Sequence, residues 1–121
     1  MSAGGALWMT LRGAVASLEP SAAALFAKQT GAVFLDVRGG EEFSSGHIAG
    51  AKNIPAAELG GSLERLGKYK EKGIVVVCGN GMNSKKAAAT LTSGGFGNLR
   101  VLAGGMAAWH EAQLPTGKGR R

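Results

Sequence analysis

Short apolar runs alternate along this chain with patterns typical of helices. The runs at 32–37 and 74–78 are rich in β-branched residues, which is typical of strands buried in the middle of a sheet. The other predicted elements are helices at 22–28, 56–66, 84–93 and from 104 onward, a short extended piece before Ile54, and a strand at 98–102. Strands and helices that alternate in this way form βαβ units, so we expect an α/β fold around a parallel sheet.

Proline and glycine mark the boundaries of these elements. Residues 17–20 lead into the first helix with the proline in its first turn, and Gly31 is expected to end that helix. Residues 1–16 are interpreted as an N-terminal extension, which could be partly artificial and could add an edge strand. Residues 17–115 are expected to form a single domain, and residues 116–121 a basic C-terminal tail.

The composition narrows the class of protein. A chain of 121 residues is long enough to bury a core, and its single cysteine cannot form an internal disulfide, so cytoplasm is the default location. No segment approaches the roughly 20 apolar residues that span a bilayer. The net charge is +6 and the pI is about 9.9. The basic residues are scattered and not interleaved with aromatic residues, so we expect neither nucleic acid nor a membrane as a partner.

The only cysteine, Cys78, ends the strand predicted at 74–78 and begins a glycine-bearing loop that leads into the next helix. Backbone N–H groups of such a loop, together with the positive end of the helix dipole, stabilise an anion at their focus. That anion would be the Cys78 thiolate, which would be a nucleophile at neutral pH. The other interpretation is a small buried apolar side chain, the most common role of a cysteine outside a disulfide. Position alone leaves the two interpretations even.

Four blocks of residues lie in order along the chain: 35–38 (Leu-Asp-Val-Arg) with 42–43, then 46–55 (Gly-His-Ile to Ile-Pro), then 74–84, and finally 104–109 (Gly-Gly-Met-Ala-Ala-Trp). Together these blocks resemble the rhodanese-like sulfurtransferase domains over nearly all of 17–115. The resemblance implies an α/β fold with a central parallel sheet flanked by helices on both faces. It also implies a cysteine that holds sulfane sulfur as a persulfide.

By this resemblance Cys78 is the catalytic cysteine, and the loop that follows binds the persulfide. The loop residues are Gly79, Asn80, Gly81, Met82, Asn83 and Ser84. The six positions from Cys78 to Asn83 resemble the sulfur-transferring branch of the family, whereas the phosphatase-like and arsenate-reducing branch usually has one more. A cradle of this smaller size fits a single sulfur better than a tetrahedral oxyanion.

The loop departs from the family pattern at Gly79 and Asn83, where members often have basic residues. Without arginine forks, capture of an anionic donor such as thiosulfate is expected to be weak. Lys85 and Lys86, in the first turn of the next helix, replace that positive field only in part. The expected donor is therefore a protein-bound persulfide, glutathione persulfide or polysulfide, and the expected acceptor is a thiol or a protein.

The expected reaction has two half-reactions. The Cys78 thiolate takes the outer sulfur of a donor and becomes Cys78–S–SH, held by loop amides and the Ser84 hydroxyl. An acceptor nucleophile then removes that sulfur and restores the thiolate. This chemistry needs no metal and no organic cofactor, and two histidines and one cysteine far apart in the sequence give no zinc-binding spacing.

Asp36 and Arg38, at a neighbouring strand end, are assigned supporting roles. We expect Arg38 to pair with Glu42 and Asp36 to accept loop amides, which would hold the scaffold. His47 is expected to be a hydrogen-bonded packing residue rather than a base for Cys78.

Four further residues receive simple interpretations. Ser84 is expected to cap the following helix, and its hydroxyl could also face the sulfur. Met82 is expected to line the mouth of the pocket. Trp109 is expected to be core packing, and His110 to be exposed.

Three alternative functions remain open. One is a rhodanese-fold regulatory or protein-interaction module in which catalysis is weak or absent. Another is a cysteine-dependent phosphatase or arsenate reductase, which the short loop and its lack of arginine disfavour. A third is nucleotide binding at Gly79-x-Gly81, but the third glycine of that fingerprint is replaced by Ser84 and the acidic partner residue is absent.

Overall fold

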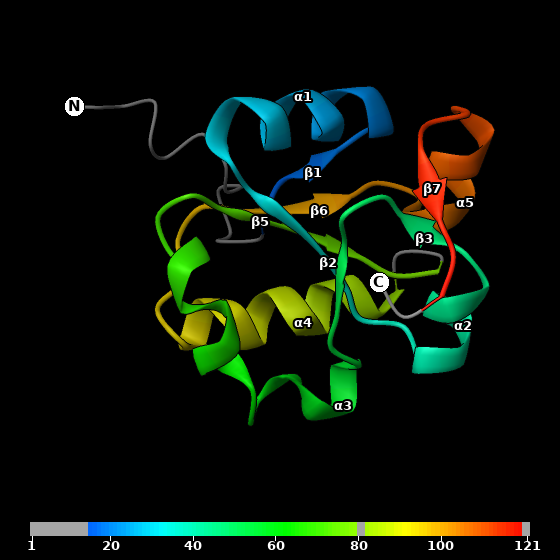
Figure 1. Ribbon diagram of the computed structural model, residues 1–121. Helices are drawn as coiled ribbons and strands as arrows, with labels where there is room; N and C mark the ends of the chain where they lie inside the picture. Colours follow the sequence, from blue (N-terminus) through cyan, green and yellow to red (C-terminus); the bar gives the residue numbers. More distant parts are fainter. Residues whose placement is uncertain (1–14, 80–81, 120–121) are drawn as a thin grey trace.

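The computed structural model describes residues 15–79 and 82–119. Five strands form the main sheet in the order β1-β6-β5-β2-β4, and each neighbouring pair is parallel. The strands are β1 (Ser17–Leu18), β2 (Val33–Asp36), β4 (Lys52–Asn53), β5 (Ile74–Val77) and β6 (Leu99–Leu102). The predicted α/β fold with a parallel sheet is confirmed, and β5 lies at the centre of the sheet (Figure 1).

Helices cover both faces of this sheet (Figure 1). On one face lie α1 (Pro20–Thr30) and α5 (Gly105–Glu111). On the other lie α3 (Ala56–Leu59), the 3₁₀ helix η2 (Leu63–Tyr69) and α4 (Met82–Ser93). Another short helix, α2 (Gly40–Ser45), follows β2.

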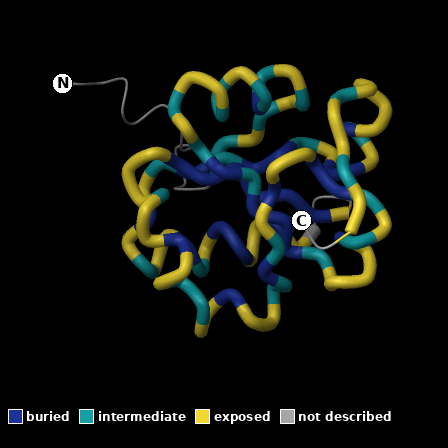
Figure 2. Tube along the Cα trace, in the orientation of Figure 1, coloured by how far each residue is buried: buried dark blue, intermediate teal, exposed yellow. Residues whose placement is uncertain are grey.

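The alternation of side chains along β5 divides the core into two clusters. Ile74, Val76 and Cys78 contribute to the cluster under α3, η2 and α4, and Val75 and Val77 contribute to the cluster under α1 and α5. All four residues of β5 are fully buried. A strand buried on both faces is apolar at every position, which explains the unbroken apolar run in the sequence. Figure 2 shows the buried strands enclosed by helices whose outer surfaces are exposed.

The structure differs from the predicted elements between residues 56 and 69. The single helix predicted at 56–66 is two elements, α3 and η2, separated by Gly60, Gly61 and Ser62. Glycine has a low helix propensity, so the pair favours a turn. Backbone N–H groups of Gly61 and Ser62 donate to the carbonyls of Glu58 and Leu59, which closes that turn.

The ends of the domain also differ from expectation. Ser17 and Leu18 form the edge strand β1, and Ala16 accepts a backbone hydrogen bond from the Val101 N–H. The predicted helix entry is confirmed at its second half, where Glu19 precedes α1 and Pro20 lies in its first turn. Residues 1–14 lie outside the described residues. At the other end, the first part of the predicted tail forms β7 (Thr116–Gly117), which pairs antiparallel with β3 (His47–Ile48). Helix α2 and strands β3 and β7 are elements that the sequence did not predict.

Gly31 ends α1 as predicted. It adopts a left-handed conformation with φ of 78°, and its N–H donates to the Ala27 carbonyl. This is the usual role of glycine just after the last residue of a helix, because a side chain there would be strained.

Two leucines on helices provide a test of the core. Leu91 on α4 is fully buried, whereas Leu25 on α1 is 54% exposed. We expect Leu91→Ala to lower the free energy of unfolding by about 2–5 kcal/mol because it leaves a cavity against the sheet. The same substitution at Leu25 should change it by less than about 0.5 kcal/mol. Urea denaturation of both variants measures the difference, and equal losses would contradict this arrangement of the core.

Candidate active site

Cys78 is the first residue after β5, at the carboxyl end of the central strand. Its side chain points to the face covered by α4, because residues alternate along the strand and Val76 faces the same way. The residue is 2% exposed. Two residues of the loop that follows, Gly79 and Asn83, are exposed.

Ser84 contacts the sulfur directly. Its side chain is fully buried, and its Oγ donates a hydrogen bond to Cys78 Sγ over 3.1 Å. Helix α4 begins at Met82, so Ser84 is inside the first turn and is not the capping residue that the sequence suggested. The second part of that prediction, a hydroxyl that faces the sulfur, is confirmed.

The remaining loop residues are placed in part. Gly79 follows Cys78, Met82 is the first residue of α4, and Asn83 is exposed in its first turn. Asn80 and Gly81 lie outside the described residues, so the cradle of loop amides stays a prediction. Lys85 and Lys86 are both exposed on α4.

Asp36, which is fully buried, forms an ion pair with the partly buried Arg38. Arg38 Nη2 lies 2.7 Å from Asp36 Oδ2, and Arg38 Nε also donates to both carboxylate oxygens. The backbone N–H of Arg38 donates to Asp36 Oδ1, and Nη2 donates to the Gly46 carbonyl. The predicted pairing of Arg38 with Glu42 is wrong, because Glu42 instead accepts from the Gly39 N–H at the start of α2. The buried carboxylate of Asp36 needs a close cationic partner more than the exposed carboxylate of Glu42 does.

His47 and Trp109 have the packing roles that the sequence predicted. His47 is fully buried, stacks on Phe43 with ring centroids 3.7 Å apart, and has Nδ1 2.8 Å from the Phe43 carbonyl oxygen. Trp109 is 2% exposed, and its Nε1–H donates to the Pro115 carbonyl. His110 is exposed.

One contact at Cys78 was missed by sequence reasoning. The backbone N–H of Met106, in α5, donates to the Cys78 carbonyl over 2.9 Å. The pair Gly104 and Gly105 was recognised only as a helix start. The available signal was that two adjacent glycines allow unusually close backbone approach.

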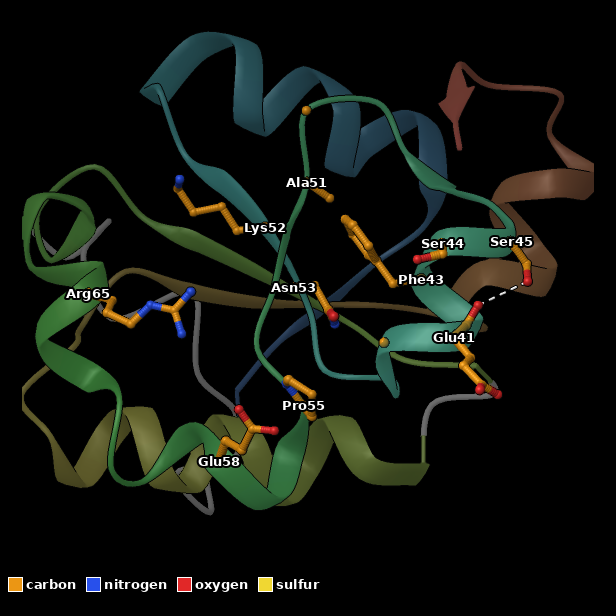
Figure 3. A pocket seen from close by; sticks show the side chains of 12 residues that line it. Glu41, Phe43, Ser44, Ser45, Ala51, Lys52, Asn53, Pro55, Glu58 and Arg65 are labelled. Atoms are coloured by element: carbon orange, nitrogen blue, oxygen red, sulfur yellow. Dashed lines mark hydrogen bonds between the residues drawn. The ribbon is translucent and has the colours of Figure 1, made fainter. Parts of the chain in front are cut away.

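An open hollow of about 1300 Å³ lies along the edge strand β4 (Figure 3). Asn53 and Pro55 line it together with side chains of α2, α3 and η2. None of the described residues of the loop after Cys78 lines it, and β5 is separated from β4 by β2. The described residues therefore do not connect this hollow to Cys78.

Within residues 15–79 and 82–119, no group of three histidine, cysteine or acidic side chains is arranged to hold a metal ion. In the same part of the chain, every helix is too short or too polar to cross a lipid bilayer.

The fold and the site together define a class of protein. It is an α/β domain with a parallel sheet, in which a cysteine lies between the central strand and the helix that follows that strand. The family model described as "Rhodanese-like domain" matches residues 20–112. The chain therefore belongs to the rhodanese-like domain family, as its sequence motifs suggested.

This chain is also similar to individual proteins. YibN of Escherichia coli strain K12, described as uncharacterized, is 38% identical over 90 residues, which cover 74% of this chain and 63% of YibN. Thiosulfate sulfurtransferase GlpE of Shewanella oneidensis is 38% identical over 78 residues, which cover 64% of this chain and 75% of GlpE. A crystal structure of thiosulfate sulfurtransferase from Pseudomonas aeruginosa matches with a TM-score of 0.77 and 28% identity, over 87% of this chain and 20% of that one. The chain thus spans less than two thirds of YibN and a fifth of the Pseudomonas protein.

The hydroxyl bond to the sulfur leads to a prediction. A hydrogen bond to an ionised group contributes more than one between neutral groups, so Ser84→Ala should slow alkylation of Cys78 by iodoacetamide at pH 7 about tenfold. Ser93→Ala, at the exposed end of the same helix, is the matched control and should alkylate like the wild type. Equal rates for wild type and Ser84→Ala would show that the hydroxyl does not stabilise the thiolate.

Proposed function

We propose that this protein is a sulfurtransferase that holds sulfane sulfur as a persulfide on Cys78. The observation that carries this proposal is the hydrogen bond from the buried Ser84 hydroxyl to Cys78 Sγ. A hydroxyl that donates to sulfur stabilises a thiolate, and a cysteine with only a packing role needs no such donor. The family contains relatives named thiosulfate sulfurtransferase, which supports the same chemistry.

The reaction proceeds by two displacements at sulfur. The Cys78 thiolate attacks the outer sulfur of a persulfide R–S–SH, the donor S–S bond breaks, and R–S⁻ leaves with its electron pair. The new Cys78–S–SH is then attacked at its outer sulfur by an acceptor thiolate, and Cys78 leaves as the thiolate again. No net oxidation or reduction of the protein occurs.

The charges around the site favour a thiol-borne persulfide or polysulfide over thiosulfate as the donor. Gly79 and Asn83 bring no charge to the loop, and Lys85 and Lys86 lie on the exposed side of α4. Arg38 offers no free fork for an anion, because Asp36 and the Gly46 carbonyl occupy it. Dianionic thiosulfate would therefore enter a site with no arginine among its described residues to bind it.

The strongest alternative is a regulatory or interaction module without catalysis. The observation that favours it is the low exposure of Cys78, at 2%. The two functions differ in whether Cys78 can accept a sulfur atom from a donor and pass it to an acceptor under mild conditions. The acceptor, whether a small thiol or another protein, and a cytoplasmic location remain predictions.

Intact-mass measurement distinguishes these functions. After brief exposure to polysulfide, the wild-type protein should gain one sulfur that cyanide or a reducing thiol removes, and it should pass that sulfur to a thiol acceptor. Cys78→Ala should gain none, because it removes the only cysteine. A wild-type protein that stays unmodified, or a Cys78→Ala protein that transfers sulfur equally fast, would refute the proposal.

The donor preference is tested by restoring a loop cation. Asn83 is exposed in the first turn of α4, so Asn83→Arg should fold normally. A charge-assisted contact to thiosulfate should raise kcat/KM for that donor about tenfold, with little change for polysulfide. Asn83→Gln is the neutral control and should leave the ratio of the two donors unchanged. If Asn83→Arg leaves this ratio unchanged as well, charge in the loop does not set the preference.

A further inference from the structure

Helix α5 approaches the backbone of the cysteine at a distance that only glycine allows. A Cβ at Gly105 would overlap the Cys78 carbonyl oxygen and would lie 2.7 Å from the Gly79 carbonyl oxygen. Both obstacles are backbone atoms, so no flexible side chain can move aside. The next residue, Met106, donates its N–H to the Cys78 carbonyl over 2.9 Å. The start of α5 therefore holds the peptide between Cys78 and Gly79.

The direction of this peptide matters for the sulfur. The described part of the chain has no cis peptide bond, and in a trans peptide the C=O and the following N–H point in opposite directions. The Cys78 carbonyl points to Met106, so the Gly79 N–H points away from α5. Met106 belongs to the core cluster on one face of the sheet, and the Cys78 side chain belongs to the cluster on the other face.

We propose that Gly105 is a positioning residue that directs the Gly79 amide to the side of the sheet where the sulfur lies. The Met106 N–H fixes the Cys78 carbonyl, and the missing Cβ at Gly105 lets α5 come close enough to do so. The first amide of the loop is thereby aimed before a thiolate or persulfide forms. This inference rests on the proposed function of Cys78 and adds a second helix to its site.

A simpler role for Gly105 would be local. Its φ is +60°, a conformation that side chains rarely adopt, so alanine would be strained there for any reason. Gly31 offers a matched comparison, because its φ is +78° and the nearest obstacle to a Cβ is the flexible Lys72 side chain, 3.4 Å away. Gly31 ends α1, which is distant in sequence from the loop after Cys78. Gly31→Ala thus introduces similar backbone strain without moving the Cys78 peptide.

The experiment compares Gly105→Ala with Gly31→Ala in the whole chain. Loss of one aimed donor should slow iodoacetamide alkylation of Cys78 at pH 7 about tenfold in Gly105→Ala and move the midpoint of its pH profile upward. Transfer from polysulfide should lose kcat by a similar factor, with KM unchanged. Gly31→Ala should alkylate and transfer like the wild type even where urea denaturation shows it to be less stable.

A second variant covers the case in which Gly105→Ala does not fold. Replacing Met106 by its α-hydroxy acid analogue exchanges the N–H for an ester oxygen and keeps the side chain. It should give the same upward change in the pH profile. The proposal is overturned if Gly105→Ala alkylates like the wild type, if Gly31→Ala slows equally, or if the ester variant has an unchanged profile. Alkylation does not depend on sulfur transfer. If the variants show the expected shifts in the pH profile while the wild type transfers no sulfur, only the proposed function is refuted.

Discussion

The candidate site depends on how the chain leaves the central strand β5. The strand is buried on both faces, so its end is fixed, and Cys78 follows it directly. Two helices then form hydrogen bonds to Cys78 from different directions. Helix α4 donates the Ser84 hydroxyl to Sγ, and α5 donates the Met106 N–H to the carbonyl oxygen. Donors that are fixed in place stabilise a developing anion without rearrangement, which is the physical basis of the proposed chemistry.

The ion pair between Asp36 and Arg38 supports the neighbouring strand end in a different way. Asp36 is fully buried at the end of β2, and the Arg38 guanidinium satisfies both of its oxygens. The same guanidinium binds the Gly46 carbonyl, so it also fixes the chain between α2 and β3. Removing Arg38 would leave the buried Asp36 carboxylate without its cation, which is strongly destabilising. Arg38 is thus part of the scaffold, and it cannot serve as the anion-binding arginine that the loop lacks.

The predictions that succeeded depended on local sequence patterns, whereas those that failed depended on contacts and burial set by the tertiary structure. The strand at 74–77 and the end of α1 at Gly31 follow from local patterns, namely a β-branched apolar run and a glycine after a helix. The pairing of β3 with β7 joins two-residue segments that are far apart in the sequence, and no local pattern marks them. The partner of Arg38 depends on burial, which the sequence does not show: Asp36 is fully buried and pairs with the arginine, whereas Glu42 is exposed.

The sequence alone determined the alternation of the main strands and helices, the α/β class, the family, and Cys78 as the reactive candidate at a strand end. These follow from periodicity, turn residues and motif spacing, which are all local. Only the tertiary structure decided which groups touch the cysteine: a serine inside α4 and a backbone amide of α5, a helix that begins more than 20 residues later in the chain. Such contacts arise because parallel strands bring the starts of separate helices to one edge of a sheet, and no local pattern encodes that meeting.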